Sequence, residues 1–336
     1  MPSSSTLIET KLKPPVQSGE LLRRPRLHDH LISFNRYRIA TVIAPAGYGK
    51  TSLLLQLYSD RNQRGDLVAW LALDNADNDI ARFMEALVYS FRITQPEFGE
   101  AILQLLKSGT KPSSESLLTA FINHVAGLKK DVYLFLDDFH LLSNASLLDS
   151  ISKMILRSPN NLCWILSTRN LPLGLPLGRL RALGHLIEID DKDLRFTHEE
   201  CSAFINKCMR LSLTEPALTI LAERTEGWVA ALQLASLSLH KVGDQQDWLE
   251  GLSGEYRDIA DFLADEVLRY QDEPVREFLL QTTVLKRLHR ELCEAVTLID
   301  NCNTVFEQVI HSRLFIFSLD ETGDWYRFHH LFSEFL

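Results

Sequence analysis

Residues 39–57 read IATVIAPAGYGKTSLLLQL, and this stretch decides the fold. A mostly apolar run leads into a turn with two glycines, and an amphipathic segment begins with Lys-Thr-Ser. A buried strand, a glycine-containing turn and a helix, in this order, are the context of a phosphate-binding P-loop. Such a turn aims successive backbone N–H groups at one anion, and the helix N-terminus adds a favourable dipole. The stretch therefore predicts that the chain binds a purine nucleoside triphosphate.

The residues of this loop have separate predicted tasks. Lys50 is expected to pair with β- and γ-phosphate oxygens, and the Thr51 hydroxyl is expected to ligate Mg²⁺. Ala44 stands where the strict pattern has glycine, and we expect alanine to be tolerated because this position ends the strand. The predicted nucleotide contacts of the loop are Ala46, Gly47, Tyr48, Gly49, Lys50, Thr51 and Ser52.

Two further strand ends supply charged residues for the same site. The segment VYLFLDDFH (132–140) runs from apolar residues directly into Asp137 and Asp138. Asp137 is expected to hold Mg²⁺ through water from a neighbouring strand, and Asp138 to position or deprotonate the attacking water. A solvated helix cap is the alternative for this acid pair. Arg169, after the run LCWILST, is expected to sense the γ-phosphate, with a surface salt bridge as the alternative.

Around these motifs, short apolar runs alternate with longer amphipathic segments. Continuous apolar runs suit strands buried on both faces of a parallel sheet, and their alternation with helices predicts a doubly wound α/β domain. The expected strands are 39–44, 67–73, 132–137, 162–168 and 185–190, and the expected helices lie near 50–62, 80–93, 114–128 and 145–157. We place a lead-in segment at 1–36 and the P-loop domain at 37–195.

From Thr197 onward the pattern becomes helical. Thr197 and Glu200 have the spacing of a capping box, and helices are expected near 215–224, 227–240 and 256–270. Short helices and then two extended segments around a turn at 321–324 indicate a winged helix. We therefore predict a helical domain at 196–271 and a winged-helix domain at 272–336. The sequence stops in an apolar helix without a cap, so we expect a fragment of a longer protein.

The bulk properties narrow the class of protein. With 336 residues, 46% of them apolar, the chain can bury a sizeable core in two or three domains. Its net charge of −9 argues against direct binding to duplex DNA, which normally requires a basic surface. No apolar run reaches the roughly 18 residues of a membrane span, and no signal-peptide pattern is present. We therefore expect the cytoplasm, with reduced and mostly buried thiols at the five cysteines.

An acidic stretch at 74–79 reads DNADND. It lacks the glycine and the final glutamate that a calcium loop requires. We expect Asp77 or Asp79 to cap the helix that follows.

Together these segments resemble the N-terminal nucleotide-binding part of the MalT-type regulators. These are signal-transduction ATPases with numerous domains (the STAND class), and they often end in a LuxR-type DNA-binding module. The resemblance runs almost end to end and rests on LLRRPRL, APAGYGKTSLL, LFLDDFHLL, ILSTRNLPLGLPLGRLRA, GWVAALQLASLSL and WYRFHHLFSEFL. It implies that Arg24 lies beside the adenine and that His329, with His330 as the second match, holds the β-phosphate of ADP. The alternative for His329 is a histidine that only packs in the hairpin.

The resemblance also has one departure. Related ATPases place a proline of the helical domain against the nucleotide, whereas Gly227-Trp228-Val229 has none. A direct adenine contact from this segment is therefore not expected.

The function that the resemblance implies is a molecular switch that uses ATP, ADP and Mg²⁺. ADP would hold a closed resting form, and a small-molecule or protein inducer would act on a C-terminal region that this sequence does not include. The ATP form would self-associate into a homo-oligomer, and slow ATP hydrolysis would reset the switch. DNA would be bound only through a further C-terminal domain, and no membrane would be involved. The alternatives are a metabolic P-loop kinase or ATPase, a scaffold that holds nucleotide without hydrolysis, and a ring-forming AAA+ motor.

Overall fold

The computed structural model describes residues 7–16, 19–32, 37–108, 112–170, 174–240, 251–254, 256–320 and 322–336. The chain forms two compact units. The first consists of Met1–Ser18, Arg23–Ile43 and Lys50–Asp190, and the second of Gly19–Leu22, Ala44–Gly49 and Asp191–Leu336. The phosphate loop is thus part of the second unit, although it connects a strand and a helix of the first. The finer domain boundaries expected from the sequence stay predictions.

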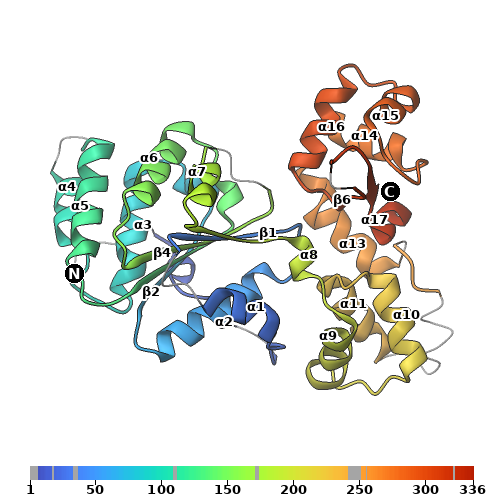
Figure 1. Cartoon of the computed structure of the whole chain (residues 1–336), viewed down its shortest axis with the longest axis horizontal. Coiled ribbons are helices and arrows are strands. Elements are labelled where there is room, and N and C mark those ends of the chain that lie inside the picture. Colours follow the sequence, from blue (N-terminus) through green and yellow to red (C-terminus); the bar gives the residue numbers. More distant parts are fainter. Residues whose placement is uncertain are drawn as a thin grey trace. The chain divides into compact units, whose positions relative to one another are not determined.

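The first unit is built on a five-stranded parallel sheet (Figure 1). Its strands are β1 (Ile39–Ile43), β2 (Leu67–Ala72), β3 (Val132–Asp137), β4 (Leu162–Thr168) and β5 (Leu186–Ile189). Their order across the sheet is β2-β3-β4-β1-β5, and every neighbouring pair is parallel. The first four strands are almost wholly buried, as expected where helices cover both faces. The predicted α/β fold class is confirmed.

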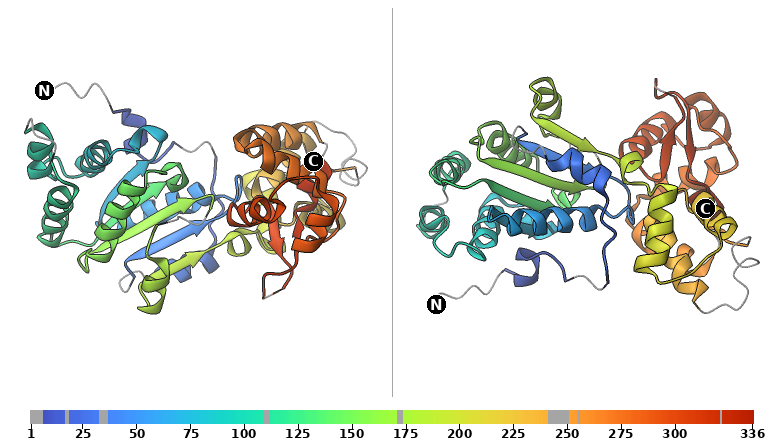
Figure 2. Two further views of the ribbon diagram at one scale, coloured as in Figure 1. Left: turned by 90° about the horizontal axis from the view of Figure 1, so that it is seen from above. Right: turned by 60° about the horizontal axis from the view of Figure 1, so that its bottom comes forward.

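Helices lie on both sides of this sheet (Figures 1 and 2). The helical elements of the first unit are η1 (Glu9–Leu12), α1 (Pro25–Ile32), α2 (Lys50–Gln63), η3 (Asn75–Asp77), α3 (Ile80–Arg92), α4 (Glu100–Lys107), α5 (Ser114–Ala126), η4 (Phe139–Leu141), α6 (Ala145–Leu156) and α7 (Leu177–Ala182). Leu71 of β2 belongs to the same core cluster as Phe83 of α3. Trp70, its neighbour in the strand, stacks on Phe135 and meets the ring of Tyr58 from α2. Successive residues of β2 therefore enter two different cores, because side chains alternate across a strand.

Helix α4 is absent from the sequence prediction, and the reason is tertiary. It has eight residues, and a helix this short is marginal in isolation. Its first turn follows Gly99, which has a φ of 67°, and Ile102 and Leu103 bury its inner face. The stacked rings of Phe91 and Phe98, with centroids 4.2 Å apart, fix the chain just before it. Packing rather than local sequence forms this helix.

The second unit is mainly helical and ends in a hairpin. Its helical elements are α8 (Asp191–Leu194), α9 (His198–Ala203), η5 (Phe204–Cys208, a π-helix), α10 (Glu215–Thr225), α11 (Val229–Leu239), α13 (Arg257–Glu266), η6 (Leu268–Tyr270), α14 (Glu273–Thr282), α15 (Arg290–Val296), α16 (Cys302–His311) and α17 (His330–Phe335). The antiparallel hairpin pairs β6 (Ile316–Ser318) with β7 (Tyr326–Phe328). The capping box is confirmed: the Glu200 N–H donates to the Thr197 hydroxyl, and the Thr197 N–H donates to the Glu200 carboxylate.

A buried ion pair ties the lead-in segment to the sheet of the first unit. Lys11 Nζ donates to both carboxylate oxygens of Asp77, at 2.6 and 2.7 Å, and to Asp74 at 3.0 Å. Asp77 is fully buried. A buried carboxylate requires a counter-charge, and Lys11 provides it. Asp79 caps α3 by accepting from two N–H groups of its first turn. Of the two predicted caps of α3, Asp79 is therefore the right one, and Asp77 is wrong.

Two further properties concern the whole described part of the chain. The five cysteines there are free thiols, four of them buried and Cys208 partly exposed. No helix in the described residues is both long and apolar enough to cross a bilayer.

Candidate nucleotide-binding site

The phosphate loop runs from the end of β1 to the start of α2. Gly47 and Gly49 have φ angles of 77° and 79°, in the left-handed region that glycine adopts without strain. Ala44 is not among the described residues with positive φ. Alanine therefore causes no strain at the position where the strict pattern has glycine. Lys50 is the first residue of α2, so the N–H groups of the first helical turn follow the loop directly.

In the first unit, Thr51, Asp137 and Ser167 form one hydrogen-bonded chain. Thr51 Oγ1 donates to Asp137 Oδ2 at 2.9 Å, and Ser167 Oγ donates to the other carboxylate oxygen. Asp137 is 4% exposed, so two hydroxyl groups determine its orientation at the end of β3. The two predicted magnesium ligands, Thr51 and Asp137, thus lie in direct contact.

Ser167 is a site residue that the sequence reasoning missed. It is fully buried at the end of β4, and it also accepts from the backbone N–H of Asp138 at 3.2 Å. One serine therefore orients both members of the acid pair. Its signal was a hydroxyl residue that ends an apolar run near Arg169. Its contact with Asp137 could not be predicted, because neither segment by itself indicates that β3 pairs with β4.

The strand arrangement corrects one detail of the prediction. Asp137 was expected on a strand next to the strand of the P-loop, but β4 lies between β1 and β3. In the sheet, β3 and the edge strand β2 lie on the far side of β4 from β1, although both precede β4 in the sequence. Thr168 at the end of β4 pairs with Ile43 at the end of β1. Arg169 therefore follows the strand that is the direct neighbour of β1.

Asp138 has a different environment from Asp137. Its φ is 57° and its side chain is 44% exposed, so it is the acid of the pair that meets water. His140 Nδ1 lies 3.9 Å from Asp138 Oδ1, although the sequence indicated no role for this histidine. Burial, together with the charges of Arg169 and Lys50, lowers the pKa of His140 to about 3. The imidazole is therefore neutral at pH 7.

In the second unit, two backbone carbonyl groups of the phosphate loop accept hydrogen bonds from the segment that begins α11. The indole Nε1 of Trp228 donates to the carbonyl oxygen of Ala46 at 3.1 Å. The N–H of Ala230 donates to the carbonyl of Gly47 at 3.0 Å. The Tyr48 ring is fully buried against Phe315. A nucleotide contact from Tyr48 would thus come from its backbone and not from its phenol.

Glu226, in the turn before α11, joins several charged residues of the same unit. Its carboxylate accepts from both guanidinium N–H₂ groups of Arg327 at 2.9 and 2.5 Å and contacts His330 Nδ1 at 2.8 Å. Burial alone would raise the pKa of Glu226, but the hydrogen bonds from His330 and Arg327 outweigh it and hold this pKa far below its ordinary value. Glu226, His329 and His330 offer ligand atoms within 4.8 Å of one another. The guanidinium groups of Arg327 and Arg195 on the same carboxylate disfavour a metal cation there.

His329 lies at the N-cap position of α17 and is fully buried. Its Nε2 is 3.1 Å from the carbonyl of Thr225, and its Nδ1 has no hydrogen-bond partner. Burial lowers its pKa to about 3, so the ring is neutral at pH 7 and can donate from only one nitrogen. A contact of His329 with ADP stays a prediction.

Arg24, predicted to lie beside the adenine, directly precedes α1. It is 6% exposed, and its carbonyl accepts from the N–H groups of Leu27 and His28 at 3.1 Å. Arg23, its neighbour, has a side chain that is 69% exposed. The role of Arg24 in base recognition stays a prediction.

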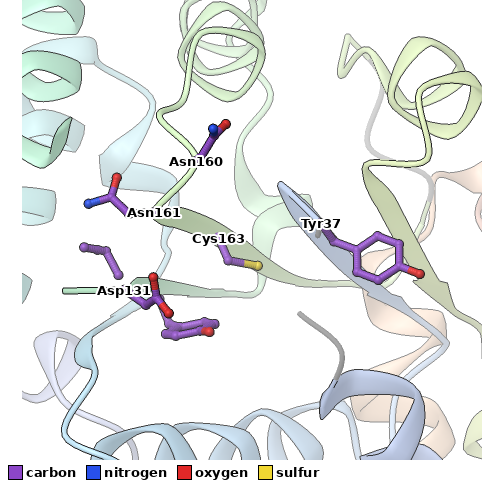
Figure 3. Close-up of a pocket in the computed structure, with 7 residues that line it drawn as sticks. Tyr37, Asp131, Asn160, Asn161 and Cys163 are labelled. Carbon is purple, nitrogen blue, oxygen red and sulfur yellow. The ribbon is translucent and has the colours of Figure 1, made fainter. Parts of the chain in front are cut away.

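A cavity of about 110 Å³ lies at the other end of the sheet (Figure 3). Its lining residues come from the N-terminal ends of β3 and β4 and from the segment before β1: Tyr37, Asp131, Val132, Tyr133, Asn160, Asn161 and Cys163. They include an acid and no lysine or arginine, which does not suit a phosphate. The Asn161 amide already donates to the carbonyls of Val125, Leu128 and Lys130. This cavity is therefore not the nucleotide site.

The parallel sheet, the phosphate loop and the Thr51–Asp137 pair define a P-loop NTPase. Two family matches agree with this: residues 35–170 match the AAA domain, and residues 264–336 match the MalT winged helix domain. The predicted winged helix is thereby confirmed. The chain thus contains an AAA-type P-loop domain followed by the winged helix domain described for MalT.

Two longer proteins are similar to almost the whole of this chain. The serine/threonine-protein kinase PknK of Mycobacterium tuberculosis is 34% identical over 97% of this chain and 29% of its own length. The HTH-type transcriptional regulator MalT of Klebsiella pneumoniae is 30% identical over 98% of this chain and 36% of its own. The chain thus spans about a third of the length of these relatives.

Solved structures with similar folds are more distant. Cdc6p from Pyrobaculum aerophilum has a TM-score of 0.47 and 12% identity, with 96% of both chains covered. AMPPCP-bound DnaA from Aquifex aeolicus has a TM-score of 0.43 and 16% identity, with 85% of both chains covered.

Proposed function

We propose that this chain is the ATP/ADP-dependent switch of a signal-responsive transcriptional regulator that acts in the cytoplasm. The observation that carries the proposal is the hydrogen bond from Thr51 to the buried Asp137, at the end of a P-loop and in one chain with a MalT winged helix. This arrangement distinguishes a nucleotide site with a metal-binding acid from an ordinary strand–helix turn. The part in transcription draws on the relationship to MalT.

The residues present fit Mg²⁺ as the metal that accompanies the nucleotide. Hydroxyl and carboxylate oxygens are the ligands that this hard cation prefers, and Thr51 and Asp137 offer one of each, 2.9 Å apart. When bound, Mg²⁺ neutralises phosphate charge. The protein contributes an acid whose orientation is set in advance by Ser167, and Lys50 adds a cation for the β- and γ-phosphates.

The two nucleotides must differ in their affinity for the two states of the switch, since equal binding shifts no equilibrium. A change from 1:99 to 99:1 requires about 5.5 kcal/mol, whereas one hydrogen bond to a charged group supplies about 1.5–3 kcal/mol. Several contacts therefore act together. We assign the γ-phosphate to Arg169, the β-phosphate of ADP to His329 and the base to Arg24.

Hydrolysis resets the switch in this proposal. Asp138 is the partly exposed acid of the pair, which suits a residue that positions or deprotonates water. P-loop turnover without an arginine from a partner is slow, on the order of 10⁻⁴ to 10⁻² per second. The ATP form self-associates, an inducer acts outside this chain, and DNA is bound by a further domain of the full-length protein.

The first test is to denature the purified protein and to identify the released nucleotide by chromatography. We expect ADP from the wild type and none from Lys50→Ala, because the phosphates lose their cation. Lys130→Ala is the matched control, since this exposed lysine donates to the carbonyl of Gly65 on the N-terminal side of β2. Retention of ADP by Lys50→Ala would reject the site assignment.

Phosphate release distinguishes the alternatives. A scaffold that only holds nucleotide releases none, and a metabolic kinase turns over a small acceptor faster than about 1 per second. The proposed switch requires slow release of phosphate from ATP alone. Either of the other two results would contradict it.

A further inference from the structure

We propose that Trp228 is a positioning residue of the phosphate loop. Its indole N–H fixes the direction of the loop amides, so that the rate of nucleotide release depends on this hydrogen bond. The inference rests on the proposed nucleotide binding and adds a residue that controls how fast the nucleotide is released. Trp228 lies in the segment 227–229, for which the sequence indicated no nucleotide contact.

The first argument is the geometry of two consecutive peptide groups. The carbonyl of Ala46 accepts from Trp228 Nε1 at 3.1 Å, and the carbonyl of Gly47 accepts from the N–H of Ala230 at 3.0 Å. The described chain contains no cis peptide bonds. In a trans peptide group the C=O and the following N–H point in opposite directions. The N–H groups of Gly47 and Tyr48 are therefore directed away from Trp228 and Ala230, and both are predicted phosphate donors.

The second argument is the close approach at Gly47. A Cβ added there would lie 2.7 Å from Trp228 Nε1 and 2.5 Å from Ala230 Cβ. At Gly49 an added Cβ would meet only Val229 Cγ2, at 4.0 Å. The absence of a side chain at Gly47 is thus what permits the hydrogen bonds, in addition to its positive φ.

The third argument is the rigid setting of the indole. Trp228 is fully buried, and its ring contacts those of Phe262, Phe315 and His329 at centroid distances of 5.7, 4.9 and 5.7 Å. The preceding residue, Gly227, has a φ of 71°, and a Cβ added to it would lie 2.5 Å from the carbonyl oxygen of Phe196. The backbone next to Trp228 is therefore closely packed as well. The indole N–H is therefore held in one direction, which is what a positioning residue requires.

The same contacts connect the loop to the winged helix. Trp228 meets the loop through its nitrogen and His329 through its ring. A displacement of His329 would thus be transmitted to the Ala46 carbonyl by one side chain.

The test is Trp228→Phe, which keeps an aromatic ring but removes the N–H. Release of a fluorescent ADP analogue, chased by excess ADP, is measured by stopped flow on the full chain. We expect release about five- to tenfold faster than in the wild type, which corresponds to about 1–1.4 kcal/mol. Trp325→Phe is the matched control, since Trp325 is 39% exposed and contacts His289; it is expected to release at the wild-type rate.

A second control separates positioning from packing. Phe332 is fully buried and its ring contacts that of Phe315, but its side chain has no group that could donate a hydrogen bond to the loop. Phe332→Leu therefore removes buried volume and leaves the hydrogen bonds of the loop in place. We expect it to lower the Tm of the nucleotide-free protein without faster release. If Trp228→Phe releases ADP at the wild-type rate, or if Phe332→Leu with an equal loss in Tm releases it as fast, the positioning role is rejected. A wild type that binds no ADP rejects the proposed function itself.

Discussion

Asp137 and Asp138 are neighbours in the chain, yet their surroundings give them different capacities. Asp137 is buried and accepts from two hydroxyls, so its carboxylate has one orientation. Asp138 has a left-handed backbone and a partly exposed carboxylate. A residue that positions a metal must be fixed, whereas one that handles water must reach solvent. The difference in burial therefore supports the proposed division of tasks in this pair.

The first prediction at this scale concerns Asp138→Ala. We expect ATP to stay bound and its hydrolysis to fall by about 10²-fold or more, because general-base catalysis contributes at least that much. Single-turnover phosphate release measures the effect. The control is Asp131→Ala, which removes the acid at the other end of β3. Unchanged turnover in Asp138→Ala would assign the water to another residue.

The second prediction compares two glycines of the loop. Gly47→Ala should destabilise the nucleotide-free protein by about 2–4 kcal/mol, from left-handed strain and from overpacking against Ala230 and Trp228. Gly49→Ala meets only the strain and should lose about 1–2 kcal/mol. Thermal unfolding compares the two variants. Equal losses would contradict the close approach at Gly47.

At the scale of elements, the turn between α10 and α11 organises the second unit. Glu226 in this turn pairs with Arg327 of β7 and His330 of α17, and Trp228, two residues later, binds the phosphate loop. One turn thus connects the helical segment with both the hairpin and the loop. Glu226 has a φ of 47°, so these contacts are made from a strained backbone position.

The prediction at this scale is that Glu226→Gln destabilises the protein by about 2–4 kcal/mol at pH 7, because Arg327 and Arg195 lose a counter-charge whose side chain is only 15% exposed. The pKa of Glu226 is lower in the folded than in the unfolded state. Its stabilising contribution is therefore complete above the unfolded pKa of about 4.3 and is lost as the pH falls below it.

The difference in Tm between wild type and variant should accordingly be constant from pH 6 to 8 and shrink below about pH 4. Glu307→Gln is the control, since its pair with Arg290 is half-exposed and contributes about 1 kcal/mol or less. A Glu226→Gln variant as stable as this control would show that the turn does not organise the unit.

At the scale of the whole molecule, the phosphate loop has a double attachment. Its chain neighbours belong to the first unit, and its hydrogen bonds through Ala46 and Gly47 belong to the second.

The prediction for the whole molecule is that His329→Ala releases ADP faster and favours self-association, because the closed form loses a phosphate contact. Stopped-flow release and light scattering with ATP measure the two effects. An unchanged ADP release rate in the variant would reject the contact.

The sequence by itself determined the phosphate loop, the five strands, the acid pair and the final hairpin. Each of these is a local pattern: glycine and lysine at fixed spacing, continuous apolar runs, or extended segments around a turn. Preferences within a few residues are therefore sufficient to predict these elements. For the same reason, the cap of α9 was predictable from Thr197 and Glu200 alone.

Only the tertiary structure decided the place of β4 beside β1, the role of Ser167, the Glu226 cluster and the hold of Trp228 on the loop. The last of these joins residues 182 positions apart, and the Thr51–Asp137 bond joins residues 86 apart. Such pairings depend on strand order and on the packing of elements, which no single segment encodes. The phosphate loop can be identified from the sequence alone, whereas the residues that position it are identified only from the tertiary structure.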